Sequence, residues 1–330
     1  MLTMPRFEWA RPASVEEALA IAAARPGACL FVAGGTDAVP NLKHRLHEPA
    51  CVVHLGGVAE LRGIREDHGA LELGALATLR ELSEHPVARE AFPALAAAAG
   101  LVASPQVRNA GTVGGNLCLD TRCTYYNQTF FWRESLGFCL KKDGLRCHVV
   151  PQGKRCVAAH SSDVAPVLIA LGAEVEIANP AGRRWLDVDA FFVGDGLHNN
   201  VLVPGELVTR VRVPAEARAW RSAYRKLRPR GAIDFPMLSV AVASRREAGR
   251  LAELRVVVGA LGAKPKGLGG LEPLVAAHGA GEALVEAVAA VAKQQCRPLT
   301  NVAYDDDWRH QMVPVYVRRA LREALAAEGA

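Results

Sequence analysis

Residues 104–118 read SPQVRNAGTVGGNLC, and this glycine-rich stretch decides how the whole chain is interpreted. Glycines and polar side chains follow one another here at short intervals, as Asn109, Gly111, Thr112, Gly114, Gly115 and Asn116. Because glycine has no side chain, such a loop exposes backbone N–H groups that can hold a phosphate. A short glycine motif by itself is also typical of an ordinary turn, so the interpretation of this motif depends on the neighbouring sequence.

A second motif of this kind lies nearer the N-terminus. Residues 28–33 (ACLFVA) have the pattern of a short buried strand, which runs directly into Gly34-Gly35-Thr36-Asp37 and then into a helical pattern over residues 38–45. The Gly-Lys-Ser/Thr ending of a Walker loop is absent. Two glycine loops, each flanked by apolar segments, predict a cradle for a long ligand that carries a pyrophosphate.

On the C-terminal side of the quoted stretch follows a cysteine-rich segment, residues 118–162. It holds five of the eight cysteines and shows neither helical nor strand periodicity. An irregular loop of this length is uncommon in a compact domain unless it is functional or held by something. Four converging thiolates would supply that restraint as one metal centre, at Cys123, Cys139, Cys147 and Cys156.

Disulfides, zinc and an iron–sulfur cluster are the alternatives for this segment. The N-terminus shows no signal-peptide pattern, and cytosolic cysteine groups more often bind metals or act in catalysis. Zinc sites usually contain two cysteines separated by two to four residues, whereas these four cysteines have 15, 7 and 8 residues between them. Iron–sulfur clusters also take four thiolates. From the spacing alone, a cluster, zinc and unligated thiols all stay open. The segment is also basic, which suits an anionic cluster, an acidic partner or simply a solvated loop.

The remaining periodicities predict an α+β protein in three parts. Capping boxes or caps at Ser14, Thr78 and Ser162-Asp163 begin helices, and alanine-rich residues 87–100 read as one helix. Residues 173–187 read as a hairpin, and 214–219 as a linker. Beyond the linker, three alternating strands and helices over 281–297 and 307–327 predict a separate α+β domain whose antiparallel sheet has one covered face. The expected division is 1–55, 56–215 and 216–330.

Composition sets further limits. The chain has 330 residues, a net charge of +5, and half of its residues are apolar, which is typical of a globular protein with more than one subdomain. No run of eighteen apolar residues predicts a membrane span, and the modest charge does not indicate nucleic-acid binding. We expect a cytoplasmic protein, since no signal peptide is recognisable.

The motifs together resemble the medium, FAD-binding subunits of the xanthine oxidase or molybdenum hydroxylase family. They occur in the family's order along the whole chain, as VAGGTD (32–37), RNAGTVGGN (108–116), SDVAPVLIALGAEV (162–175), GELV (205–208), YRK (224–226) and DFPMLSVAVA (234–243). The resemblance implies a two-subdomain FAD-binding fold of the vanillyl-alcohol oxidase/p-cresol methylhydroxylase type, followed by a C-terminal α+β domain. It assigns no catalytic residue to this chain.

Carried over residue by residue, the resemblance implies three groups of FAD contacts. The pyrophosphate would rest on the first loop, at Val32, Ala33, Gly34, Gly35, Thr36 and Asp37. The flavin would be held from the second loop by Thr112, Gly114, Gly115, Asn116 and Cys118. Three later residues would approach the cofactor, namely Asp163, Val208 and Lys226.

The cysteine-rich segment departs from most of the family. Its runs DTRCTYYNQ (120–128), FCLKKDG, CHVV and KRC resemble an insertion, here at about 119–160, of the β subunits of 4-hydroxybenzoyl-CoA reductases. That resemblance implies a [4Fe-4S] cluster on Cys123, Cys139, Cys147 and Cys156. It also implies a large molybdenum-cofactor subunit, a small subunit with two [2Fe-2S] clusters, a dimer of such heterotrimers, and a ferredoxin-like electron carrier.

Rival interpretations stay open at this point. Aldehyde-oxidising relatives also carry a cluster in their FAD subunit, with other cysteine spacings, so the complex could work oxidatively. A zinc-stabilised flavin-binding scaffold and a stand-alone flavin oxidase are the alternatives of another class.

Overall fold

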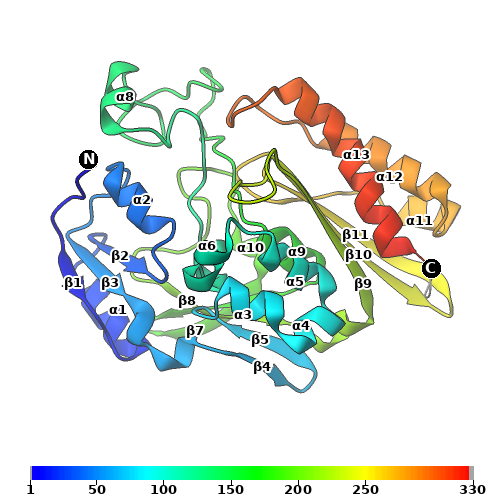
Figure 1. Ribbon diagram of the computed structural model, residues 1–330, viewed down its shortest axis with the longest axis horizontal. Coiled ribbons are helices and arrows are strands. Elements are labelled where there is room, and N and C mark those ends of the chain that lie inside the picture. The colour runs from blue at the N-terminus through cyan, green and yellow to red at the C-terminus, as the bar shows by residue number, and fades with distance from the viewer. Residues whose placement is uncertain (1, 327–330) are drawn as a thin grey trace.

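The computed structural model describes residues 2–326, and three sheets lie side by side along its long axis (Figure 1). The N-terminal sheet is small and parallel, the middle sheet has five strands, and the C-terminal sheet has four. The cysteine-rich segment projects from the middle part toward one side, at the top of Figure 1. The domain boundaries expected near residues 55 and 215 remain a prediction. Residues 1 and 327–330, which belong to the first and last expected parts, lie outside the described residues.

The first sheet has the order β1 (Glu8–Ala10), β3 (Cys51–His54), β2 (Cys29–Val32), with all strands parallel. Helix α1 (Val15–Ala23) begins where Ser14 accepts a hydrogen bond from the Glu17 backbone, as the capping pattern predicts. Helix α2 (Ala38–Lys43) follows β2 after the GGTD turn, also as predicted. Two short 3₁₀ turns, η1 (Leu55–Gly57) and η2 (Ala59–Leu61), lead into the middle part.

The middle sheet is antiparallel in the order β4, β5, β8, β6, β7. Its strands are β4 (Ile64–Asp67), β5 (Ala70–Gly74), β6 (Glu174–Asn179), β7 (Gly182–Asp187) and β8 (Leu207–Val213). The predicted hairpin is β6–β7, with Glu174 opposite Asp187. Strands β1 and β4 were not predicted, because β1 has only three residues and β4 (IRED) is mostly charged and exposed.

Short helices fill the space between the middle and C-terminal sheets. They are α3 (Leu79–Glu84), α4 (Pro86–Ala91), α5 (Pro93–Gly100), α6 (Pro105–Ala110), α7 (Val113–Leu117), α9 (Val164–Ala170) and α10 (Val188–Phe191). The single helix expected over 87–100 is wrong. The chain breaks at Phe92, whose φ of −134° is not helical, because Pro93 has no N–H to continue the hydrogen-bond ladder. Phe92 is fully buried, so the break also anchors this layer in the core.

The C-terminal sheet is antiparallel in the order β12, β11, β10, β9, as predicted for its three long strands. Its elements are β9 (Trp220–Leu227), β10 (Leu238–Glu247), β11 (Arg250–Gly259), β12 (Lys266–Gly267), α11 (Glu272–His278), α12 (Glu282–Gln295) and α13 (Asp306–Leu325), preceded by the 3₁₀ turn η3 (Ala215–Ala219). The expectation that only one face of this sheet is covered is wrong for β10, because its other face packs against the middle part of the chain. Ala241 and Ala243 pack into the middle core, whereas Val240 and Val242 pack toward α12 and α13, as the two-residue period of a strand requires. Residue 327 of the helix expected over 307–327 lies outside the described residues.

The cysteine-rich segment has little regular structure, as predicted, apart from α8 (Phe130–Ser135). Hydrogen bonds connect it to the N-terminal and the C-terminal parts of the chain. The buried Arg133 side chain donates to the backbone carbonyls of His44 and Arg45, each at 3.2 Å, and the Thr124 N–H donates to the Asn301 carbonyl at 2.8 Å. Within residues 2–326, no helix is both long and apolar enough to cross a membrane.

Candidate functional site

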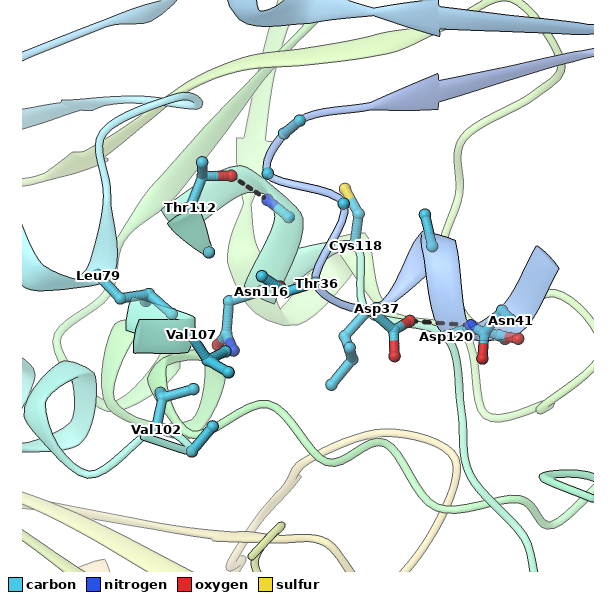
Figure 2. Close-up of a pocket in the computed structure, with 18 of the residues that line it drawn as sticks. Thr36, Asp37, Asn41, Leu79, Val102, Val107, Thr112, Asn116, Cys118 and Asp120 are labelled. Atoms are coloured by element: carbon cyan, nitrogen blue, oxygen red, sulfur yellow. Dashed lines mark hydrogen bonds between the residues drawn. The ribbon is translucent and has the colours of Figure 1, made fainter. Parts of the chain in front are cut away.

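The main cavity lies where the two glycine motifs meet. Its volume is about 220 Å³, and residues of both glycine motifs line it. Figure 2 shows Leu79, Val102 and Val107 on one side and Asp37, Asn41 and Asp120 on the other. Most of the predicted cofactor residues line this space, namely Val32, Ala33, Gly34, Gly35, Thr36, Asp37, Thr112, Gly115, Asn116, Cys118 and Asp163.

The two motifs touch through their backbones. A Cβ on Gly34 would overlap the carbonyl of Ala110, and a Cβ on Gly114 would lie 2.8 Å from the Cβ of Ala75. A larger residue at Gly34 would therefore push the two motifs apart, and one at Gly114 would push the second motif away from Ala75. The glycine requirement is a packing requirement as well as a means of exposing N–H groups.

The second glycine motif is not an open loop as predicted but mostly helical. Ser104 caps α6 and Thr112 caps α7, where the Thr112 hydroxyl accepts from the Gly115 N–H at 3.1 Å (Figure 2). These hydroxyls allow two very short helices to begin in a glycine-rich sequence. Asn116 then points back to α9, where its Oδ1 accepts from the Ser162 hydroxyl at 2.6 Å.

Asp163 does not cap α9 with its side chain. Ser162 does so instead, because its hydroxyl accepts from the Ala165 N–H at 3.0 Å. The buried Asp163 carboxylate accepts from the Tyr224 hydroxyl at 2.6 Å and from Lys226 Nζ at 2.9 Å. Burial raises the pKa of Asp163, and Lys226 opposes that rise. Lys226 therefore reaches the cavity wall through Asp163 and is not itself part of the lining.

A second cavity adjoins the main one and is larger and more apolar. It is lined by Gly114 and Val208, the two predicted residues that the main cavity lacks besides Lys226. The two cavities share five lining residues, Leu30, Phe31, Ala33, Gly115 and Cys118. Residues of β2 and of both glycine motifs therefore face both spaces.

Sequence reasoning did not assign several residues that close the main cavity. Ile233, Asp234 and Phe235 are consecutive lining residues, and Ile233 holds an unusual φ of 74° for a β-branched residue. Arg122, from the cysteine-rich segment, pairs with Asp37 and lies 4.1 Å from the Phe235 ring centre. The available signal was that Asp234 and Phe235 begin the DFPMLSVAVA motif (234–243).

The four predicted metal-ligand cysteines line one small cavity in the cysteine-rich segment. Cys139, Cys147 and Cys156 are buried, Cys123 is partly exposed, and all four are free thiols. Backbone N–H groups point at two sulfurs, from Val150 to Cys147 Sγ at 3.4 Å and from Ala158 to Cys156 Sγ at 3.5 Å. Burial, together with the other three cysteines, raises the pKa of Cys123 to about 12.

The geometry of this cysteine cavity bears on what it could hold. In the described part of the chain, no three His, Cys, Asp or Glu side chains are arranged to hold a single metal ion. A four-iron cluster takes one thiolate on each iron, so its ligands surround a space and do not meet at one atom. Cys118 is separate from the cavity. Burial raises the pKa of its thiol to about 12, and it lines the main cavity.

The sequence matches two family models over nearly its whole length. Residues 5–216 match the FAD binding domain in molybdopterin dehydrogenase, and residues 222–324 match the CO dehydrogenase flavoprotein C-terminal domain. The chain belongs to this family. It is an FAD-binding subunit of a molybdenum hydroxylase-type oxidoreductase.

Similar proteins agree with this assignment. The carbon monoxide dehydrogenase medium chain of Hydrogenophaga pseudoflava is 30% identical over 98% of both chains. The FAD-binding subunit of an Escherichia coli aldehyde oxidoreductase is 32% identical over 79% of this chain and 83% of its own. A solved structure of the Hydrogenophaga pseudoflava carbon monoxide dehydrogenase, lacking the Mo-pyranopterin moiety, superposes with a TM-score of 0.80 and 28% identity over 98% of this chain and 99% of its own. The predicted fold is thereby confirmed.

Proposed function

We propose that FAD spans both cavities and crosses between them over the two glycine motifs. The observation that carries this is the set of five lining residues common to the two spaces, because one elongated ligand needs a continuous site. Backbone N–H groups near Gly34 and Gly35 suit the pyrophosphate, while Gly115 belongs to the motif proposed to hold the flavin. The remaining residues surround the two ends of the cofactor, namely Val32, Ala33, Thr36, Asp37, Thr112, Gly114, Asn116, Cys118, Asp163 and Val208, with Lys226 acting through Asp163.

When bound, FAD would exchange electrons in pairs or singly, which is the chemistry that such a subunit contributes. The protein itself binds and orients the cofactor. The buried Lys226–Asp163 pair fixes a polar wall, and Ile233 and Phe235 add apolar side chains to the lining. Within the described residues we assign no general acid, nucleophile or molybdenum ligand, so substrate chemistry belongs on a partner subunit.

We further propose that Cys123, Cys139, Cys147 and Cys156 hold a [4Fe-4S] cluster. The support is that four thiols from one irregular segment line a single cavity, two of them with N–H groups directed at their sulfurs. When bound, the cluster would carry single electrons between FAD and an external carrier. A zinc-stabilised scaffold is the second candidate for this cavity, since zinc also takes four thiolates.

Single Cys→Ser variants test the cysteine cavity. Cys139→Ser or Cys147→Ser should abolish the iron-derived visible absorption of the anaerobically purified chain while FAD stays bound. Cys296→Ser is the matched control, because Cys296 is a buried free thiol after α12, outside the cysteine cavity. Loss of FAD together with iron would contradict the proposal that the two sites are separate, and zinc in place of iron would establish the scaffold.

For the complex we propose a large molybdenum-cofactor subunit and a small subunit with two [2Fe-2S] clusters, paired as a dimer of heterotrimers. The names of the relatives as a medium chain or an FAD-binding subunit support a multi-subunit enzyme. A ferredoxin-like protein is the proposed external carrier. Copurification of the tagged chain from its source, followed by molybdenum analysis and mass measurement of the intact complex, tests this composition.

The proposed reaction is the reductive dehydroxylation of 4-hydroxybenzoyl-CoA. Two electrons and two protons would convert the substrate to benzoyl-CoA and water, with electrons entering through this chain. The resemblance of the cysteine-rich segment to the reductase insertion supports this direction. The purified complex should form benzoyl-CoA with reduced ferredoxin as donor.

An oxidative reaction is the alternative. It is favoured by the similarity to the carbon monoxide dehydrogenase medium chain and to the aldehyde oxidoreductase subunit. In that case the same complex would oxidise carbon monoxide or an aldehyde with an artificial electron acceptor, and would leave 4-hydroxybenzoyl-CoA unchanged.

A further inference from the structure

One carboxylate lies in the wall between the main cavity and the cysteine cavity. Asp120 lines the main cavity, and its carboxylate accepts hydrogen bonds from two residues that line the cysteine cavity. Lys141 Nζ donates to Oδ1 at 2.6 Å, and the Tyr126 hydroxyl donates to Oδ2 at 2.7 Å. His47, which also lines the main cavity, approaches Oδ2 at 3.5 Å.

Lys141 is buried to an extent that is rare for a lysine. Its side chain is only 6% exposed. Besides Asp120, its ammonium donates to the Gly196 carbonyl at 2.7 Å and to Thr121, and it lies 4.5 Å from the Tyr126 ring centre. Every donor direction is thus satisfied by protein, so the charge is fixed in position beside the cysteine cavity.

The neighbouring Lys142 provides a direct contrast. Its side chain is 26% exposed and pairs with Asp143 at 3.2 Å, whose own side chain is 37% exposed. Water and salt screen a charge in that setting, whereas they screen the Lys141 charge far less. The two lysines are adjacent in sequence but differ in the field that they exert on the cavity.

We propose that Lys141, held by Asp120, raises the reduction potential of the centre bound by the four cysteines. This inference rests on the proposed cluster. Reduction adds negative charge to a thiolate-bound centre, and a buried positive charge nearby stabilises the reduced form. Lys141 is therefore a positioning residue for charge and not a ligand, and Asp120 fixes the ammonium while partly offsetting its field.

The test is an EPR-monitored redox titration of the full chain, prepared anaerobically, for wild type and three variants. Lys141→Met removes the charge and keeps the length of the side chain, and it should shift the midpoint potential of the cysteine-bound centre downward. Asp120→Asn removes the offsetting charge, and it should shift the same potential upward because Gly196 and Thr121 still hold Lys141. Lys142→Met is the matched control and should leave the potential unchanged.

The outcomes separate this inference from the proposed function. A wild-type chain without iron would refute the cluster, and the inference with it. Iron and FAD at wild-type levels with no shift in Lys141→Met, or with an equal shift in Lys142→Met, would refute the inference alone. If Lys141→Met loses its iron, the potential of Asp120→Asn becomes the deciding measurement. An upward shift of that potential would support the proposal, and no upward shift would overturn it.

Discussion

Gly34 packs so closely against Ala110 that a Cβ on Gly34 would overlap the Ala110 backbone carbonyl. The two residues are far apart in sequence and belong to the two glycine motifs. Their contact sets the distance between the walls of the main cavity. Backbone packing between the two motifs therefore shapes the proposed FAD site.

The first prediction concerns this contact. Gly34→Ala should separate the motifs and lower FAD affinity by at least about tenfold, or about 1.4 kcal/mol. FAD retained after gel filtration measures the effect. Gly262→Ala is the control, because a Cβ there meets nothing within 4 Å. Wild-type FAD content in Gly34→Ala would show that the two motifs tolerate separation.

The second prediction concerns Gly196, which lies against a proposed ligand. A Cβ on Gly196 would lie 2.9 Å from Cys156 Sγ and 3.2 Å from the Ala158 N–H nitrogen. Gly196→Ala should therefore displace the thiol and reduce iron content while FAD content stays normal. Gly194→Ala, two residues earlier with nothing within 4 Å, should match wild type. Equal iron content in both variants would count against Cys156 as a ligand.

The third prediction concerns the pair between Arg122 and Asp37, which joins the cysteine-rich segment to the first glycine motif. Arg122→Ala would leave the Asp37 carboxylate without this partner and would free the segment around Phe235. FAD affinity should fall about tenfold to a hundredfold, since hydrogen bonds to charged groups contribute about 1.5–3 kcal/mol. Titration of the apoprotein with FAD measures this. Arg155→Ala, exposed in the same segment, should bind FAD normally.

The fourth prediction concerns pH. Burial lowers the pKa of His160 from its ordinary 6.5 to about 4. Between these values the unfolded chain binds a proton that the folded chain does not, so stability falls as pH drops below 6.5. Replacing His160 with Leu should reduce the loss of unfolding free energy between pH 7 and pH 5 by about 2 kcal/mol.

Urea unfolding at the two pH values checks this prediction. His278→Leu is the control, because His278 is exposed at the end of α11. An unchanged pH dependence in His160→Leu would mean that His160 takes up its proton as readily in the folded chain as in the unfolded one.

Local sequence signals predicted much of the fold. Ser14 and Thr78 begin helices where their patterns indicate, because capping depends on residues only three apart. The β6–β7 hairpin and the strands β9, β10 and β11 follow from alternating apolar residues. The break at Phe92 was missed because the alanine-rich pattern continues across it, although Pro93 marks the position.

Contacts between distant residues were not predictable in the same way. The sequence predicted either Ser162 or Asp163 as the cap of α9, and Ser162 supplies it, whereas the pairing of the Asp163 carboxylate with Lys226 from β9 was not predicted. No pattern of neighbouring residues in the sequence predicts two further contacts, the pairing of Arg122 with Asp37 and the packing of Gly196 on Cys156. They depend on how the sheets and the cysteine-rich segment come together.

The central claim is that one chain carries both FAD and a four-iron cluster. The most direct measurement is the iron, acid-labile sulfide, zinc and FAD content of the anaerobically purified chain, with an EPR spectrum after reduction. The account predicts about four irons and four sulfides per FAD and a signal from the reduced cluster. FAD bound at full occupancy with zinc, or with no metal at the four cysteines, would contradict it.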